Sequence, residues 1–586
     1  MTASTSLSQS SASFSSSPSS SSATVTEADV ESQRSTGTGT GTGNRVSYWR
    51  TLIDQAGVTD HVLHHKYAGN GTPDSPYLVE FLPNDPYNGL AFSNARKWLI
   101  TLVQAAATLS VSFASSAFSG GISDVLVEFH VSSEVAILGV SMFVLGFAIG
   151  PLFWAPLSEM FGRQKLFFLT YMALTAFNAG AAGAPNIESL IILRFFAGAF
   201  GSSPLTNAGG VIADLFTAAD RGIASSIFSM APFLGPALGP IAGGFLGESH
   251  GWRWVQGMIT IFNGVVWVVS TLSYPETYAP VLLQRRAEAL SRRTGKVYIS
   301  KLDAGKPTHD TVASKFRVAL LRPWVLLLRE PIVLLTSVYM AIIYGTLYLC
   351  FAAFPIVFQA GRGWSPGIGG LAFIGIAVGM SIATFGSILD NKRYARVAAA
   401  HDGAAPPEAR LPPGLVGSIL IPAGMFWFAW TNGPEIHWIV PIIGSGLFGA
   451  GIVLVFLSLM TYLIDSYVIY AASVLAANSV LRSLFGAAFP LFTRYMYEDL
   501  GIHWASSLPA FLAVACVPFP FLFYRYGAPI RAKCRYASEA AGALQAMRSK
   551  QQQQQQQHHG SEEGGEGGGF MAEIEMERTR SGAHPN

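Results

Sequence analysis

Long apolar runs separated by short polar stretches dominate the chain between residues 98 and 524. Each run has about the length that a helix needs to cross the ~30 Å hydrocarbon core of a bilayer. A longer polar segment divides the runs into two sets of six, which predicts an all-α integral membrane protein with twelve spans. The expected spans are residues 98–119, 135–157, 166–184, 190–212, 223–246, 255–272, 332–354, 368–389, 415–430, 439–463, 470–492 and 508–524.

Lysine and arginine are concentrated in alternate connections between these runs. By the positive-inside rule, both termini and the central segment are expected in the cytoplasm. The cations of the central segment are expected to lie on the inner leaflet. The opposite connections contain few cations, with Arg253, Arg362 and Arg494 as the main exceptions.

The two ends of the chain have a different composition. Ser and Thr dominate up to about Gly43, and the tail contains poly-Gln and Glu/Gly tracts. Such sequences cannot bury enough apolar surface to offset the entropy of ordering. The predicted organisation is therefore a disordered cytoplasmic N-terminal region (1–83), a six-helix bundle (84–274), a cytoplasmic central segment (275–330), a second six-helix bundle (331–535) and a disordered cytoplasmic tail (536–586).

Composition narrows the function class. Half of the residues are hydrophobic, only 12% are charged and the net charge is +2, so nothing indicates nucleic-acid binding. Three widely spaced cysteines provide neither a metal cluster nor a disulfide framework. We find no catalytic cluster or phosphate-binding loop and expect no enzyme, no metal and no cofactor. The expected partners are a small-molecule substrate, protons and the lipid bilayer, and the expected state is a monomer.

The connection between the second and third runs is short and charged. It contains Glu159, Gly162, Arg163 and Lys165. A loop this short joins two antiparallel membrane helices on one side of the bilayer. Gly162 permits the tight turn, and the charged side chains are expected to form a network that breaks and re-forms during transport.

This loop resembles the signature loop between helices two and three of the major facilitator superfamily, with Glu159 where the family usually has Asp. The segment Pro275-Glu276-Thr277-Tyr278 resembles an element typical of the fungal twelve-span drug:proton antiporter branch. The resemblance implies the major facilitator fold, with two six-helix bundles and alternating access around a central cavity.

The fifth run contains glycines at intervals of four residues, two of them followed by proline. Glycines at this spacing share one helix face and allow close helix packing. The run also resembles the antiporter motif of major facilitator drug exporters, which implies outward transport. The motif positions are Gly235, Pro236, Gly239, Pro240, Gly243 and Gly244.

Two cations lie deep within apolar runs, Arg194 in the fourth and Arg482 in the eleventh. A membrane-buried arginine is costly unless it is paired or hydrated, so it usually faces a cavity. Arg194 resembles a family arginine associated with proton coupling; the alternative is that it binds carbonyls of a neighbouring helix. We find no Asp or Glu near the middle of any run, which favours neutral or anionic ligands.

By analogy with the family, the first, fourth, seventh and tenth spans line the cavity. Candidate contacts are Ser115, Ser116, Thr206, Asn207, Tyr344, Tyr348 and Phe354, although aromatic residues in membrane helices often serve only packing. The leading hypothesis is a proton-coupled exporter in the cell membrane, for a secondary metabolite such as an organic acid or for a drug-like xenobiotic. The alternatives are a glycolipid or polyamine exporter, or a non-transporting receptor; the carboxylate-free core disfavours polyamines.

Overall fold

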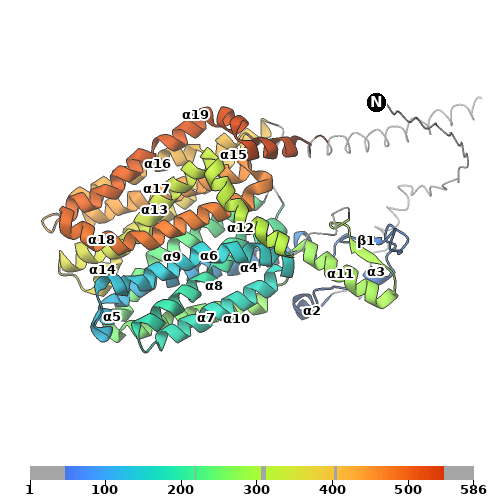
Figure 1. Ribbon diagram of the computed structural model, residues 1–586, viewed down its shortest axis with the longest axis horizontal. Coiled ribbons are helices and arrows are strands. Elements are labelled where there is room, and N and C mark those ends of the chain that lie inside the picture. The colour runs from blue at the N-terminus through green and yellow to red at the C-terminus, as the bar shows by residue number, and fades with distance from the viewer. Residues whose placement is uncertain (1–45, 218–219, 305–311, 402–404, 547–548, 550–586) are drawn as a thin grey trace, which may run out of the picture. The chain divides into compact units, whose positions relative to one another are not determined.

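The computed structural model describes residues 46–217, 220–304, 312–401, 405–546 and 549. The low-complexity segment 1–45 and nearly all of residues 547–586 lie outside the described residues. The described part is mainly helical, and its long helices run side by side (Figure 1).

The first set of long helices follows the first six apolar runs. It comprises α4 (Asn94–Ala117), α6 (Ser133–Phe161), α7 (Arg163–Ala182), α8 (Ile187–Leu215), α9 (Arg221–His250) and α10 (Trp252–Ser273). A 3-10 turn, η2 (Phe118–Gly121), and a short helix, α5 (Ile122–Phe129), follow α4.

The second set follows the remaining runs. It comprises α13 (Pro331–Phe354), η3 (Pro355–Ala360), α14 (Pro366–Leu371), α15 (Phe373–Ala399), α16 (Pro412–Thr431), α17 (Ile439–Ser466), α18 (Ala471–Cys516) and α19 (Pro518–Lys533), with the short turns η4 (Pro407–Arg410) and η5 (Val468–Tyr470).

Ten described helical stretches are long and apolar enough to cross a membrane, whereas the sequence predicts twelve spans. The counts differ in two places. The helix α7 is not among the ten, because Arg163, Gln164, Lys165 and several small residues dilute its apolar character. The ten also count residues 468–533 as one stretch of 66 residues, which would be ~100 Å long as a single helix. Gly501 breaks this stretch with a φ of +73°, at a point between the two predicted spans.

Glycines allow the closest contacts between the two halves. A Cβ atom on Gly244 of α9 would lie 2.5 Å from the carbonyl oxygen of Pro366 in α14, and one on Gly370 of α14 would lie 2.5 Å from that of Pro240 in α9. Any larger side chain at either position would force the helices apart. The other main contact between halves joins α6 to α18.

The segment before α4 is ordered, so the prediction of disorder up to residue 83 is wrong for residues 48–83. This stretch contains α2 (Tyr48–Ile53), α3 (Asp60–His64) and β1 (Tyr77–Val79), and η1 (Gly89–Ala91) follows. The strand β1 pairs in parallel with β2 (Tyr298–Ser300) of the central segment, with Tyr77 opposite Tyr298. Local composition could not predict this order, because the partner strand is distant in the sequence.

The central segment holds the N-terminal segment in place. Its helix α11 (Ala279–Thr294) contributes Leu283 and Leu290 to a small apolar core with Val58 and Val79. Arg286 of this helix forms a buried ion pair with Asp85. The expectation that the cations of the central segment lie on the inner leaflet is therefore wrong for Arg286.

The second helix of the central segment, α12 (Val312–Arg329), packs against α13 and α18. The start of the predicted tail is also ordered, because residues 535–546 are helical. Glu330 accepts hydrogen bonds from the hydroxyl of Tyr467 (2.8 Å) and the backbone N–H of Tyr536 (2.9 Å). These contacts connect the tail to the second half, so disorder cannot begin as early as residue 536.

Candidate transport site

Two tyrosines on one face of α13 connect the two halves in the interior of the bundle. The hydroxyls of Ser115 in α4 and Tyr348 in α13 are 2.7 Å apart, and both side chains are buried. The hydroxyl of Tyr344, one turn earlier, donates a weaker hydrogen bond to that of Tyr348 at 3.4 Å. Three of the predicted cavity residues thus meet at one point.

The guanidinium group of Arg194 is fully buried and bonded to neighbouring helices. Nε donates to the carbonyl of Gly139 in α6 (2.6 Å), and Nη1 to Oε1 of Gln256 in α10 (3.3 Å). Nη2 donates to the carbonyls of Ala114 (3.2 Å) and Ser115 (3.4 Å) in α4. Arg194 therefore ties three helices to α8, as in the alternative interpretation.

Aromatic rings enclose this guanidinium group. Its central carbon lies 4.5 Å from the ring centroid of Phe118 and 4.8 Å from that of Phe143. Cation–π attraction of this kind offsets part of the cost of burying a charge without a carboxylate partner.

Arg482 has a different environment. Its guanidinium group lies 4.7 Å from the ring centroid of Tyr344 and 5.0 Å from that of Phe456 in α17. Its Nε atom is buried and has no hydrogen-bond partner in the described part of the chain. Because a buried donor without a partner is costly, this nitrogen is available to an acceptor from outside the protein.

Contacts through Ser115, Tyr348 and Tyr344 thus join the two intramembrane arginines. Arg194 donates to the carbonyl of Ser115, the two tyrosine hydroxyls follow, and Arg482 lies over the ring of Tyr344. No hydrogen bond or ion pair to a carboxylate occurs at either arginine within the described residues. This polar bridge, defined by these five residues, carries uncompensated positive charge.

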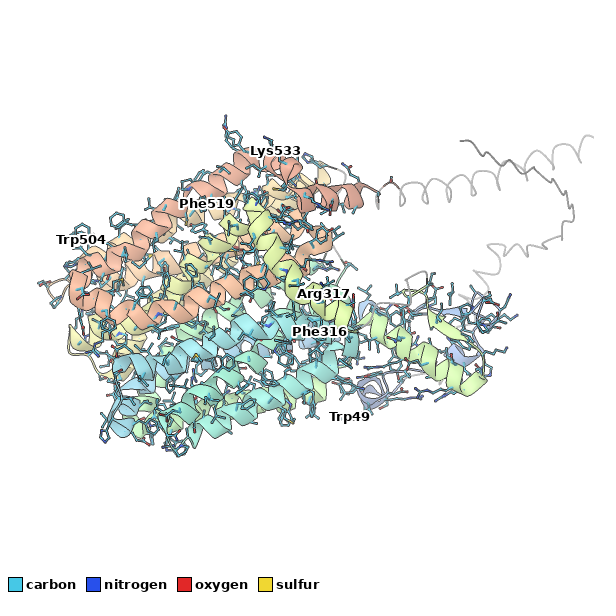
Figure 2. All side chains as sticks on the ribbon, viewed as in Figure 1. Trp49, Phe316, Arg317, Trp504, Phe519 and Lys533 are labelled. Atoms are coloured by element: carbon cyan, nitrogen blue, oxygen red, sulfur yellow. The ribbon has the colours of Figure 1, made fainter. Side chains whose placement is uncertain are left out.

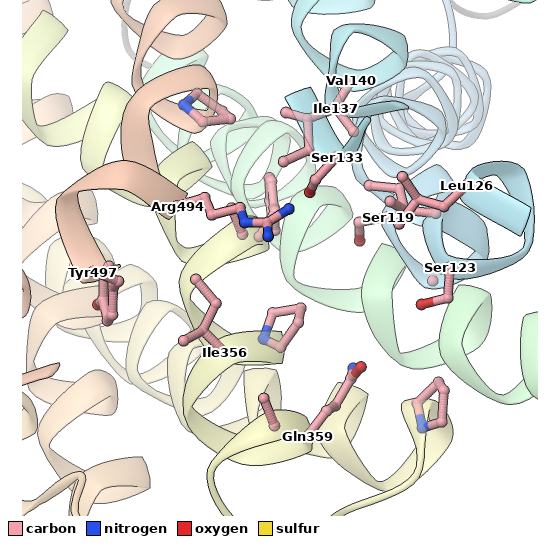
Figure 3. A pocket seen from close by; sticks show the side chains of 18 of the residues that line it. Ser119, Ser123, Leu126, Ser133, Ile137, Val140, Ile356, Gln359, Arg494 and Tyr497 are labelled. Carbon is pink, nitrogen blue, oxygen red and sulfur yellow. The ribbon is translucent and has the colours of Figure 1, made fainter. Parts of the chain in front are cut away.

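A cavity of about 410 Å³ is lined by residues that follow Ser115 and Tyr348 in the chain, and Figure 3 shows its lining. It lies at the end of the helices that carries α5 and α14, opposite α11 (Figure 1). Its walls come from both halves and include Ser119, Ile137, Phe351, Gln359, Arg494 and Tyr497. Ser119 follows Ser115 by about one helical turn, and Phe351 follows Tyr348 by three residues. The Ser115–Tyr348 hydrogen bond therefore lies about one helical turn away from the cavity, measured along the helix axis.

The other predicted contacts do not join this site. Ser116 packs against Gly239, Thr206 and Asn207 bond within α8, and Phe354 belongs to an aromatic cluster with Phe428. These side chains serve helix packing here.

Arg494 is a cavity residue that was not expected from the sequence. In the cavity it forms an ion pair with Glu498 (2.7 Å), and both side chains are about half exposed. A signal existed, since Arg494 is one of three cations on the predicted outer side. The other two have fixed partners: Arg253 pairs with Glu128, and Arg362 donates to backbone carbonyls.

At the opposite end, the short charged loop meets the end of α10. The backbone N–H groups of Arg163 and Gln164 donate to the carboxylate of Glu276 at 3.0 and 3.2 Å. Gly162 has a φ of +93°, and a Cβ at this position would lie 2.1 Å from that carboxylate. The charged loop around Gly162 and the segment that contains Glu276, which are separate motifs in the sequence, thus contact each other. Only glycine fits at position 162 of this turn.

The charge network differs from the predicted one. The Nε atom of Arg163 donates to Asp214 of α8 at 2.6 Å, and the hydroxyl of Thr277 donates to the same carboxylate at 3.2 Å. Glu159 and Lys165 are exposed and form no ion pair within the described residues. The expected partnership among Glu159, Arg163 and Lys165 is therefore wrong; Asp214 and Glu276 are the partners.

The tyrosine beside this network is affected by the same charges. The guanidinium group of Arg163 lies 4.9 Å from the ring centroid of Tyr278. Burial, followed by the negative charge of Glu159, raises the pKa of Tyr278 to about 12. Its hydroxyl therefore stays protonated at cellular pH.

The glycine motif of α9 forms a close contact with α4. Cβ atoms on Gly235, Gly239 and Gly243 would lie within 2.0–2.6 Å of atoms in Ser112, Ser116 and Ala117. The fourth motif glycine, Gly244, faces α14 in the other half, as described above. Pro236 and Pro240 lie inside the same helix. The motif packs one helix against both halves of the molecule.

Comparison with known proteins decides the family. The model of the Major Facilitator Superfamily matches residues 105–490. The chain belongs to the major facilitator superfamily. This confirms the fold class expected from the sequence motifs, two bundles of membrane helices.

Several curated relatives are transporters of fungi, and one of them is named an efflux pump. The chain is 63% identical to "MFS-type efflux pump MFS2" of Trichophyton rubrum, over 86% of this chain and 84% of that protein. It is 61% identical to "Major facilitator superfamily multidrug transporter mdrA" of Aspergillus fumigatus, over 85% and 82%. It is 44% identical to "Citrinin biosynthesis cluster MFS transporter mrr1" of Monascus ruber, over 79% and 92%. The expected fungal drug-efflux branch is confirmed.

Similarity to solved structures supports the fold of this chain but not its function. The proton:xylose symporter XylE, bound to 6-bromo-6-deoxy-D-glucose, superposes with a TM-score of 0.54 at 17% identity. The match covers 74% of this chain and 96% of XylE.

Proposed function

We propose that this protein is a proton-driven efflux pump for small neutral or anionic organic compounds, such as an aromatic organic acid. The observation that carries the substrate class is the polar bridge. It presents Arg482 Nε, a buried donor without a partner, beside two tyrosine hydroxyls and no carboxylate. An anionic or acceptor-rich ligand would satisfy this donor, whereas an organic cation would meet repulsion.

Export rather than import is supported by two of the relatives, one named an efflux pump and the other a multidrug transporter. The cavity is lined by residues of α5, η3 and α18 and so lies at the end of the helices opposite α11, which is the end predicted to face the cytoplasm. In this proposal the cavity is the exit path, and the Ser115–Tyr348 hydrogen bond separates it from the cytoplasmic side. Rocking of the two halves would break this bond as the substrate passes.

The loop network closes the opposite end in this arrangement. Arg163, Asp214 and Glu276 link the start of α7, the end of α8 and the end of α10. We infer that this network is intact when the exit cavity is open and is released when the cytoplasmic side opens. The proposed location is the cell membrane, with both termini in the cytoplasm, as the distribution of cations predicts.

Proteoliposomes containing the purified chain would test this proposal under an imposed pH gradient. An aromatic carboxylate such as benzoate should move against its own gradient in the direction opposite to protons, and a lipophilic cation such as rhodamine 6G should move much more slowly. Collapse of the pH gradient should stop the movement. Equal transport of the cation would contradict the substrate class, and transport that is insensitive to the pH gradient would contradict proton coupling.

A further inference from the structure

A second cavity lies at the α11 end, on the outer surface of the first half. It has a volume of about 520 Å³ and is enclosed by the end of α2, the first turns of α7, the last turn of α10 and α11. Its lining includes Ile53, Lys165, Phe168, Ser270 and Arg285. None of these residues belongs to the polar bridge or to the exit cavity.

Polar groups without partners line this second cavity. Arg285 donates through Nη2 to the carbonyl of Phe161 at 2.6 Å, but its Nη1 atom is buried and has no partner among the described residues. The hydroxyl of Ser270 is likewise buried without a partner. Lys165 is exposed and forms no ion pair within the described chain. Three donors, two of them cationic, are therefore available to one anionic ligand.

The one acidic side chain on this lining is already engaged. Asp54 lies 3.5 Å from the guanidinium group of Arg50, and its Oδ1 atom accepts from the backbone N–H groups of Ala56 and Gly57. It therefore does not neutralise Lys165 or Arg285, and the cavity is positively charged overall.

Apolar side chains around this cavity are exposed. In α2, Trp49 is 55% and Ile53 78% exposed, and Phe168 of α7 is 41% exposed. Trp49 lies at the edge of the helices where the N-terminal segment begins (Figure 2). Tryptophan and tyrosine at such an edge are typical of the boundary between lipid and water.

Hydrogen bonds hold α2 at this position. The hydroxyl of Tyr48 donates to the carbonyl of Leu272 at 2.7 Å, and the side-chain amide of Gln164 donates to the carbonyl of Leu52 at 2.9 Å. The exposed apolar side chains of α2 are therefore fixed next to the cationic cavity.

We propose that this second cavity binds the phosphate group of an anionic glycerophospholipid in the leaflet that faces α11, with Lys165, Arg285 and Ser270 as its ligands. The adjoining apolar surface of α2 and α7 would contact the acyl chains. This surface favours a lipid over free phosphate, which would gain nothing from Ile53 or Phe168. The proposal concerns the membrane and does not depend on which substrate is exported.

Native mass spectrometry of the purified full chain would test the site with phosphatidylserine and phosphatidylcholine that carry the same acyl chains. Wild-type protein should retain phosphatidylserine preferentially. A cation that contacts the headgroup of an anionic lipid contributes about fivefold to its binding, so Lys165→Gln with Arg285→Gln should weaken retention about 25-fold. Lys165→Arg with Arg285→Lys should restore most of it.

The matched control removes two exposed lysines elsewhere at this end, Lys392→Gln with Lys533→Gln, and should bind as wild type (Lys533 is labelled in Figure 2). If the Lys165/Arg285 double variant does not fold, Lys165→Gln alone should still weaken retention about fivefold. Excess inorganic phosphate should not displace the lipid. Displacement by phosphate, equal retention of both lipids, or unchanged binding by the variants would overturn the proposal.

Discussion

Two arginines lie within the membrane region of this protein, and their surroundings differ. Arg194 is completely buried, donates four hydrogen bonds and ties α4, α6 and α10 to α8. Arg482 is partly buried, lies between two aromatic rings and leaves one buried nitrogen without a partner. Four of the five N–H donors of Arg194 are therefore engaged, whereas Arg482 donates no hydrogen bond within the described residues.

The two arginines show how a cation that holds helices together differs from one that we propose to bind a ligand. A buried cation whose donors are mostly occupied by carbonyl oxygens belongs to the scaffold, because releasing it would leave several polar groups unsatisfied. A cation held mainly by aromatic faces can accept a new anionic partner at little cost. Sequence motifs favour Arg194 as the functional cation, but the geometry favours Arg482.

The largest expected effect is loss of folded protein in Arg194→Ala. The substitution leaves the carbonyl of Gly139 and the amide of Gln256 without their donor, which should destabilise the fold by at least about 3 kcal/mol. Thermal unfolding in detergent, followed by the monodisperse fraction, measures it. Arg482→Ala is the control and should unfold close to wild type. An Arg194→Ala protein as stable as wild type would remove the structural distinction between the two sites.

The next effect concerns transport. Arg482→Gln should lower proteoliposome export of an aromatic carboxylate at least about tenfold, because a charge-assisted hydrogen bond is lost while the fold remains intact. Arg482→Lys, which keeps the charge but not the planar fork, should retain part of the activity. Full export by Arg482→Gln would show that its unpaired nitrogen does not contact the substrate.

A third test adds Arg163, which has a carboxylate partner, to the comparison of Arg194 and Arg482. Arg163→Ala and Asp214→Asn each break the network at the cytoplasmic end, so both should reduce transport several-fold while the protein still reaches the membrane. The matched control is Glu159→Gln, an exposed acid on the same loop that forms no ion pair with any residue the structure describes. Greater loss in Glu159→Gln than in Asp214→Asn would restore the network expected from the sequence.

The smallest effect is expected for the hydroxyl that links the halves. Tyr348→Phe removes the hydrogen bond to Ser115, worth about 1 kcal/mol, and should change the export rate two- to fivefold. Tyr339→Phe is the control in the same helix, because the Tyr339 hydroxyl is buried and has no partner in the described part of the chain. Identical rates in both variants would mean that the bridge does not limit transport.

The sequence alone located most of the membrane helices and the family. Apolar length and helix spacing are local properties, so the runs containing Arg194, Tyr344 and Arg482 could be placed without a structure. Motifs such as Gly162 with its neighbouring charges also depend on residues adjacent in the chain. These features hold wherever the helices finally pack.

The structure was needed to assign partners. Glu276 binds the loop at Arg163, β1 pairs with β2, and Arg286 pairs with Asp85, each across more than a hundred residues of chain. Hydropathy contains no information about such pairs, which explains why residues 48–83 were wrongly predicted to be disordered. It also explains why Asp214 was absent from the predicted network.

What the sequence determines and what the tertiary structure determines therefore differ in how far apart in the chain the interacting residues are. Local sequence determined that the chain forms apolar helices with an arginine in the fourth and eleventh runs, because a bilayer selects for length and hydrophobicity. Only the tertiary structure decided that carbonyls from three helices satisfy Arg194 while Arg482 keeps a free donor, because the number of hydrogen-bond partners around a buried charge depends on which helices pack against it.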